Sequence, residues 1–278
     1  MRVLTQPGPV HPRRIESLAG ESRTLSFAVP AGATLLDGLT APLAAAGFQS
    51  AVLRFSGARL NPFRYVMPDR AADETHVAYF SAPRAPEGTT VVETAAATFG
   101  WNGGAPFLHC HAFWTEPDGK RRGGHILNAE SRLAAPLVID AWGFDSLRIA
   151  TAPDAETNFT LFQPAGVSRP GANAILARVR PNEDILTALE TIAADHAWPN
   201  ASVVGSVGSL VGTRFADGRD LADVATEVLV LDGAVRNGRA TLDLASIDMT
   251  GEVHTGRIAH GENAVCITFD LVLLRGDP

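Results

Sequence analysis

The chain has 278 residues, and its 23 Lys and Arg against 30 Asp and Glu give a formal net charge of -7. This acidic balance argues against a protein that gains its affinity by neutralising many phosphates. With 46% hydrophobic residues the chain can bury a core, yet no run approaches the ~20 apolar residues of a membrane span. The first residues lack the apolar segment of a signal peptide, and two cysteines fit a reducing compartment, so we expect a cytoplasmic protein.

The first half of the chain alternates between strand and helix signals. The first twenty or so residues, rich in Pro, Arg and Gly, indicate an arm. Alternation over 25–29 then predicts a strand, and apolar residues at helical spacing over 35–43 predict a helix. Further strands with Gly-rich turns between them are expected over 51–55, from 89 to about 100, over 106–114 and over 137–140.

The second half repeats this order after a segment rich in Pro and Gly near 163–173, which is typical of a linker. Leu39 matches Leu189 and Ala51 matches Ala201 at one constant offset, 189 - 39 = 150. An internal repeat of domain size is therefore predicted. Each unit should have a strand, a helix and then several strands, so we predict an α+β class in which a largely antiparallel sheet packs with a helix.

Three histidines lie close together on a predicted β-hairpin. His109 and His111 are two apart in a strand, so their side chains project from the same face, while Cys110 faces the opposite side and belongs to the core. A turn at Asp118-Gly119 would return the chain antiparallel and bring His125 beside them. Three imidazoles without a fourth protein ligand are typical of a zinc site with an open position, and Ni²⁺, Co²⁺ or Fe²⁺ also accept imidazole. The alternative is that all three histidines are structural.

This motif resembles the signature of the plants-and-prokaryotes conserved domain (PPC or PCC, also known as DUF296). The resemblance rests on His109-Cys110-His111, Asp118-Gly119 and Gly123-Gly124-His125-Ile126-Leu127. It extends over nearly the whole chain as two tandem copies, residues 22–162 with the histidine motif and residues 174–275 without it. The resemblance implies a homotrimer with His109, His111 and His125 as metal ligands near a subunit interface. Bacterial relatives often carry a DNA-binding label by analogy with the plant proteins.

The second copy departs from the motif at the metal ligands. Asp243 and Ala245 stand where the two strand histidines are expected, and Arg257 stands for the third. Arg257 carries a permanent charge and cannot replace a neutral imidazole, so the second copy is expected to have lost the metal. Arg257 then either pairs with Asp243 or holds an anionic substrate against the metal of the first copy.

Other charged residues are candidates for supporting roles. Glu93 and Glu227 stand at the heads of strands that the repeat makes equivalent, so either could orient a ligand histidine or be a solvent-exposed strand start. Arg121 and Arg122 adjoin the histidine motif and, with Arg257, are candidates to bind an anionic substrate.

These patterns predict a metal-binding protein, with zinc as the first choice, that acts as an enzyme or a binder on a small, anionic, oxygen-rich molecule. Hydrolase, lyase and isomerase chemistry all stay open. The alternatives are a DNA-associated regulator, as the family label implies, and an oligomeric scaffold stapled by the metal. The chain lacks the Arg-Gly-Arg-Pro core of an AT-hook, so no nucleic-acid partner is expected. No membrane partner is expected either, because no apolar run is long enough to span one.

Overall fold

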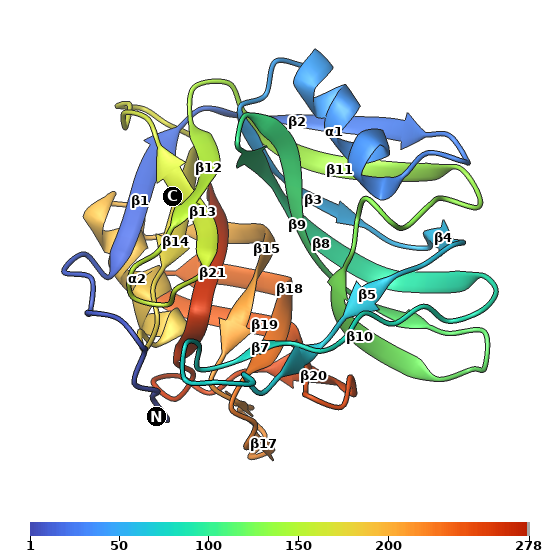
Figure 1. The fold of residues 1–278 in the computed structure, drawn as a ribbon. Helices are drawn as coiled ribbons and strands as arrows, with labels where there is room; N and C mark the ends of the chain where they lie inside the picture. The colour runs from blue at the N-terminus through green and yellow to red at the C-terminus, as the bar shows by residue number, and fades with distance from the viewer. Residues whose placement is uncertain (277–278) are drawn as a thin grey trace.

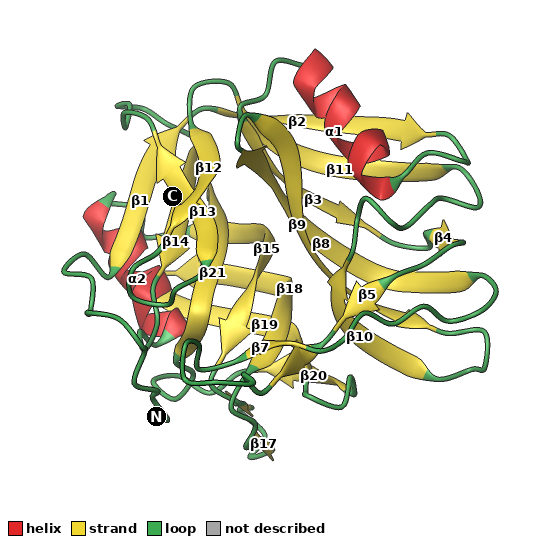
Figure 2. Ribbon diagram, in the orientation of Figure 1, coloured by secondary structure: helices red, strands yellow, loops and turns green. Residues whose placement is uncertain are grey.

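The computed structural model describes residues 1–276 and is mostly β-structure, with 51% of the chain in strands (Figure 2). In the described residues the helices are α1 (Leu35–Ala45) and α2 (Ile185–Asp195), each 11 residues long. The expected α+β class is therefore wrong, although both helices lie where apolar spacing predicted them. Most of each half forms antiparallel strands that tight turns connect, and such connections need no helix. One short helix per half is therefore all that the described residues contain.

The first sheet contains ten strands, and every neighbouring pair along its main path is antiparallel. Its order is β2 (Ser22–Val29), β11 (Leu137–Phe144), β3 (Ser50–Phe55), β8 (Thr90–Asn102), β9 (Ala105–Thr115), β10 (Arg121–Ile126) and β5 (Tyr65–Val66). Three further strands branch from β8, namely β4 (Arg59–Leu60) and the hairpin of β12 (Arg148–Pro153) and β13 (Thr160–Ala165).

The second sheet contains seven strands, again paired antiparallel. Its order is β1 (Ile15–Gly20), β14 (Ala174–Val179), β21 (Val265–Arg275), β15 (Ala201–Leu210), β18 (Thr226–Arg236), β19 (Arg239–Ile247) and β20 (Val253–Arg257). Two small ribbons complete the set, β16 (Thr213–Arg214) with β17 (Asp220–Leu221), and β6 (Pro68–Asp69) with β7 (Tyr79–Phe80). The expected arm of twenty residues is thus too long, because its end forms β1 and covers the edge of β14.

Six strands of each sheet follow the same order. Numbered along the chain within each half, they read 1-6-2-3-4-5 in both sheets, from β2 to β10 in the first and from β14 to β20 in the second. A helix connects the first and second of these strands in each half. The two halves therefore share one strand order.

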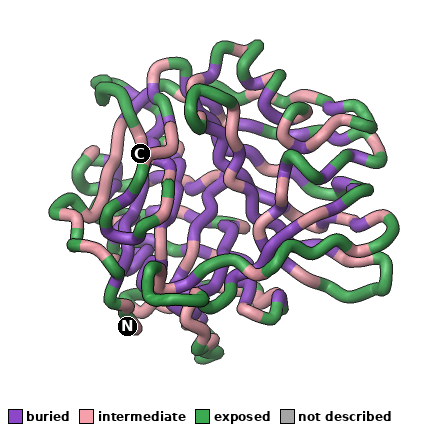
Figure 3. The backbone as a smooth tube through the Cα atoms, in the orientation of Figure 1, coloured by how far each residue is buried: buried purple, intermediate pink, exposed green. Residues whose placement is uncertain are grey.

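The two sheets face each other and carry their helices on the outside (Figure 1). Leu35, Leu39 and Leu43 of α1 join the core on the outer face of the first sheet, and α2 does the same for the second. Between the sheets, Ala96 and Phe113 of the first pack with residues of β15, β18 and β19 in the second. Figure 3 shows buried backbone along the strands of both sheets, with exposed residues mainly in the turns. The inner faces therefore form a single interface inside the molecule.

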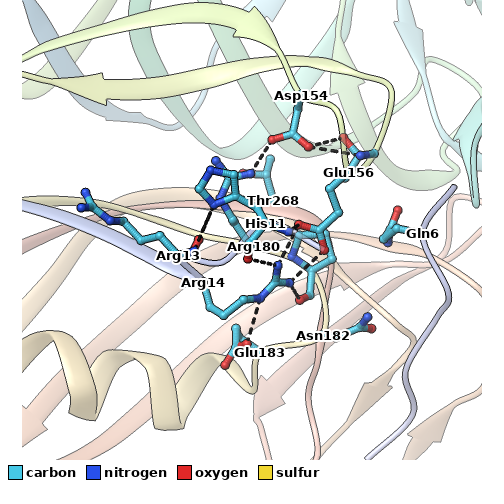
Figure 4. Close-up of polar contacts among 12 residues, drawn as sticks. Gln6, His11, Arg13, Arg14, Asp154, Glu156, Arg180, Asn182, Glu183 and Thr268 are labelled. Carbon is cyan, nitrogen blue, oxygen red and sulfur yellow. Dashed lines mark hydrogen bonds and ion pairs between the residues drawn. The ribbon is translucent and has the colours of Figure 1, made fainter. Parts of the chain in front are cut away.

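Buried ion pairs tie the halves together (Figure 4). Asp154, in the turn between β12 and β13, accepts hydrogen bonds through Oδ2 from Arg178 at 2.8 Å and Arg180 at 2.5 Å. Although burial opposes the shift, the two guanidinium groups hold the pKa of Asp154 well below its usual value. Nearby, Arg14 pairs with the buried carboxylate of Glu156 at 2.8 Å. These pairs fix the β12–β13 hairpin of the first half against β14 of the second.

Candidate metal centre

The histidine motif forms the predicted hairpin, and alternation along β9 separates its two faces. Cys110 belongs to the core under α1, as expected, whereas His109 and His111 point toward the second sheet. The turn at Asp118-Gly119 returns the chain as β10, in which His125 is the direct cross-strand partner of His111. One side-chain nitrogen of each of the three histidines lies within 4.8 Å of those of the other two. The structure thus brings together the three residues predicted as metal ligands.

Two glycines before His125 allow the strand to pass close to its neighbours. A Cβ atom on Gly123 would lie 2.4 Å from Cγ1 of Ile247 in the second sheet. Gly124 has a φ of +152°, and a Cβ atom there would lie 2.4 Å from the carbonyl oxygen of Val66. These glycines therefore let β10 lie close to the second sheet and to β5.

The second sheet determines which nitrogen of each β9 histidine carries its proton. Nδ1 of His109 lies 3.1 Å from Oδ2 of Asp270, and Nδ1 of His111 lies 2.9 Å from the carbonyl oxygen of Val228. Carboxylate and carbonyl oxygens accept hydrogen bonds, so Nδ1 of each ring is the donor. In the neutral rings Nε2 then carries the lone pair, which is the arrangement that metal-ligating histidines adopt.

The arrangement of these nitrogens calls for a cation between them. The Nε2 atoms of His109 and His111 lie 3.0 Å apart, so two lone pairs face each other. A tetrahedral zinc ion with bonds of ~2.0–2.1 Å holds its nitrogen ligands about 3.3 Å apart, which is close to this separation. Nδ1 of His125 is buried without a hydrogen-bond partner among the described residues. The donor set therefore fits a divalent transition metal.

Burial keeps two of the three rings neutral. Desolvation, and then the neighbouring His109, lower the pKa of His125 to about 3. Desolvation also lowers the pKa of His111 well below its usual value, with His109 and His125 acting in the same direction. Neutral imidazole is the form that binds a metal, so these rings need not release a proton at neutral pH to accept one.

A small cavity of about 90 Å³ opens beside His109 and His111. Its walls are mostly apolar and combine both sheets with the β6–β7 ribbon. The lining residues are Pro68, Ala78, Tyr79, Phe80, His109, His111, Phe159, Leu161, Gly208, Ser209, Ala225, Thr226, Glu227, Ile267 and Thr268. Phe80 also packs edge-on against His125, with the ring centroids 5.4 Å apart. His109 and His111 thus line a cavity with partly aromatic walls, and no Lys or Arg of the described chain is among its lining residues.

Glu227 is the carboxylate of this cavity. It lies on β18, and its Oε1 is 3.8 Å from Nε2 of His111. Its Oε2 is buried without a hydrogen-bond partner in the described residues. Burial raises the pKa of Glu227 to about 8.

The other candidate site residues lie elsewhere. Arg121 pairs with Glu93 at 3.0 Å, and Glu93 also accepts a hydrogen bond from Thr115, so among described contacts this carboxylate reaches no histidine. Arg122 donates to the carbonyl oxygen of Thr250 at 2.9 Å. Neither arginine lines the cavity of the histidines.

Arg257 pairs with Asp243 at 2.7 Å, the first of the two alternatives that the sequence left open. Asp243 faces Arg257 across the strands as His111 faces His125. Asp243 therefore stands at the place of His111, and the sequence alignment that put Ala245 there was two residues out of register. The same two-residue shift applies to Glu227. Its cross-strand partner Ile247 corresponds to Thr115, and Thr115 pairs with Val91. Glu227 therefore corresponds to Val91 and not to Glu93.

Sequence reasoning missed Asp270 and assigned Glu227 only in general terms. Asp270 was detectable as a lone acidic residue in the otherwise apolar run 269–273, since a buried carboxylate normally has a partner. Its partner His109 lies 161 positions away, and no local pattern indicates that contact.

No family profile and no curated protein match the sequence. Among solved structures, a plant- and prokaryote-conserved (PPC) protein of Pyrococcus horikoshii is 18% identical, with a TM-score of 0.42 over 55% of this chain and 97% of that one. A metal-containing protein of Archaeoglobus fulgidus is 16% identical, with a TM-score of 0.41 over 54% and 99%. A candidate DNA-binding protein of Ralstonia eutropha is 16% identical, with a TM-score of 0.37 over 50% and 89%.

Each of these alignments covers about half of this chain. Within residues 1–276, neither helix is long and apolar enough to cross a membrane.

Proposed function

We propose that the chain is a metal-binding protein in which His109, His111 and His125 hold one divalent transition metal, with zinc as the first choice. The observation that carries the proposal is the 3.0 Å separation of two Nε2 atoms whose rings both donate through Nδ1. Imidazole ligands suit Zn²⁺, and also Ni²⁺, Co²⁺ and Fe²⁺. Two tandem PPC-like units, residues 22–162 and 174–275, are proposed on the shared 1-6-2-3-4-5 strand order.

The residues of the chain prepare the centre in two ways. Asp270 and the carbonyl of Val228 hold the protons at Nδ1 of His109 and His111, which keeps both Nε2 atoms free for the metal. Tyr79 and Phe80 contribute aromatic side chains to the wall of the cavity, and Phe80 also packs against the ring of His125. When bound, a divalent metal supplies Lewis acidity toward an oxygen atom of a ligand.

The ligand that this cavity suits is a small molecule with an oxygen donor and an apolar body. Aromatic and aliphatic side chains form most of the wall, and such walls bind apolar groups. The anionic substrate expected from the sequence has less support, because Arg121 and Arg257 are engaged in ion pairs and no Lys or Arg lines the cavity. The homotrimer and the lack of a nucleic-acid partner stay predictions. Enzyme and binder stay as alternatives.

The test is metal analysis by mass spectrometry on the untagged full-length protein after equilibration with zinc. We expect about one metal ion per chain, lost in both His109→Ala and His125→Ala. His260→Ala is the matched control, because His260 also contacts a carboxylate, Glu190 at 3.0 Å, but belongs to no group of possible metal ligands in the described chain. A wild-type protein that takes up no transition metal would reduce the three histidines to structural residues.

A further inference from the structure

Glu227 brings a carboxylate from the second sheet to the end of the cavity where the histidines of the first sheet lie. Its side chain is only 6% exposed. Of its neighbours in the cavity wall, Ser209 accepts a hydrogen bond from the backbone N–H of Ile267, and Thr226 contacts the hydroxyl of Thr213. Glu227 is therefore an acidic residue of the cavity to which metal binding by the three histidines assigns no role.

No group of the described chain compensates this carboxylate. Oε2 lacks a hydrogen-bond donor, and the contact within ion-pair distance is with His111, which burial keeps neutral. Asp154 provides the contrast, because that buried carboxylate accepts hydrogen bonds from two arginines. Burial disfavours the ionised form of such a group, whereas a divalent cation on the adjacent histidines would favour it. In either form a buried carboxyl oxygen without a hydrogen-bond donor is costly, so it is normally matched by a partner that binds to it.

The position of Glu227 distinguishes a ligand-contacting role from a metal-ligating one. The three histidines form the group whose donor atoms lie within 4.8 Å of one another, and Glu227 is not part of that group. It lines the cavity together with His109 and His111, and its Oε1 lies 3.8 Å from the Nε2 that His111 turns toward the centre. Glu227 thus lies next to the three histidines and lines the same cavity as His109 and His111.

We propose that Glu227 binds the ligand of the metal centre, accepting a hydrogen bond from an O–H or N–H group that the ligand carries next to its metal-binding oxygen. The proposal rests on the function proposed above. It narrows the ligand class to small molecules that combine an oxygen donor, an adjacent hydrogen-bond donor and an apolar body. Simple carboxylate anions lack the donor and place a second negative charge beside Glu227, so the site selects against them. The centre then combines both sheets. The first sheet provides the histidines that bind the metal, and the second provides the carboxylate that recognises the small molecule.

The experiment uses full-length protein saturated with Co²⁺, whose visible spectrum reports ligands that enter the coordination sphere. Acetohydroxamic acid, which has oxygen donors beside N–H and O–H groups, is compared with acetate, which has none. We expect wild-type protein to bind acetohydroxamic acid more tightly than acetate. In Glu227→Gln the affinity for acetohydroxamic acid should fall on the order of 10- to 100-fold, as expected for loss of a hydrogen bond to a charged group, while acetate binding stays equal or improves.

Two further variants separate the possible results. Glu190→Gln is the matched control, because Glu190 contacts His260 at 3.0 Å away from the cavity and should leave both affinities unchanged. Glu227→Asp keeps the charge but withdraws the carboxylate, so it should weaken acetohydroxamic acid binding even if Glu227→Gln folds poorly.

The proposal is overturned if Glu227→Gln changes the two affinities equally or not at all. It is also overturned if that variant no longer retains Co²⁺ at saturating concentration, since Glu227 would then be a metal ligand. Failure of the wild-type protein itself to take up Co²⁺ would instead refute the metal centre.

Discussion

At the scale of single residues, the centre depends on side chains whose protons are placed by their neighbours. His109 and His111 differ in this respect, because the first donates to a carboxylate and the second to a backbone carbonyl. A carboxylate partner raises the basicity of a ligand imidazole as well as fixing its orientation. Asp270 can be changed by mutation and the carbonyl of Val228 cannot, so Asp270 offers the direct test of this support.

Asp270→Asn is expected to weaken zinc binding about 10- to 100-fold, because the amide still orients His109 but no longer provides a negative charge. Competition with a chromophoric chelator measures the dissociation constant. Asp243→Asn is the control, since Asp243 is paired with Arg257 at the corresponding place of the second sheet. Equal zinc affinity in wild type and Asp270→Asn would mean that the carboxylate contact does not act on the metal.

The metal-free protein should show a pH dependence that follows from two kinds of buried group. His125 has a pKa of about 3 when folded against 6.5 in its usual environment, so the unfolded chain binds more protons between these values and stability is lost as the pH falls from 6.5 to 3. Glu227 has a folded pKa of about 8 against 4.5, so the folded chain binds more protons and stability is lost as the pH rises from 4.5 to 8. Each group contributes at most about 1.4 kcal/mol per pH unit.

Urea unfolding in the presence of a chelator isolates the Glu227 contribution. The free energy of unfolding of wild type minus that of Glu227→Gln should decrease steadily from pH 4.5 to pH 8. A difference that stays constant over this interval would show that Glu227 titrates in the folded protein as it does in the unfolded chain.

At the scale of elements, β10 positions His125 because its glycines let this strand lie close both to the second sheet and to β5, its neighbour in the first sheet. Gly123 packs on Ile247 of the second sheet, and Gly124 passes the carbonyl of Val66 in a backbone conformation that side chains rarely adopt. The neighbouring Asp118-Gly119 turn also uses a positive φ, +82° at Gly119, but faces open space. A comparison of Gly124 with Gly119 can therefore separate the effect of backbone conformation from the effect of close packing within one hairpin.

Gly124→Ala should destabilise the protein by roughly 1–3 kcal/mol more than Gly119→Ala, because both replacements strain the backbone but only the first collides with β5. Since His125 follows directly, Gly124→Ala should also lower zinc affinity, whereas Gly119→Ala should not. Thermal unfolding of the metal-free proteins and zinc titration measure the two effects. Equal stability of both variants would refute the packing argument.

At the scale of the whole molecule, the two sheets form one structural unit. The inner faces share an apolar interface, the contact of His109 with Asp270 joins the two sheets at the histidine cluster, and the ion pairs of Asp154 with Arg178 and Arg180 cross between the halves. Separating the sheets would expose all three features to water at once, which favours unfolding as a single cooperative step.

Asp154→Asn is expected to cost about 3–5 kcal/mol of stability, because it leaves two buried guanidinium groups without their shared carboxylate. Asp145→Asn is the control: it breaks an exposed pair with Arg23, which solvent screens, and should leave stability nearly unchanged. Chemical denaturation followed by tryptophan fluorescence gives both values. Similar losses in the two variants would contradict the view that this network holds the halves together.

The sequence alone determined the features that depend on local periodicity. Period-two alternation put His109 and His111 on one face and Cys110 in the core, and Asp118-Gly119 set the hairpin that pairs His125 with His111. The α+β class was wrong because strand lengths and the fate of residues 15–20 depend on which edges find partners. Only the tertiary structure decided that Asp270, Val228 and Glu227 face the histidines, and that Arg121 and Arg257 do not. These contacts join residues more than a hundred positions apart, so they arise from the packing of one sheet on the other, which no local pattern encodes.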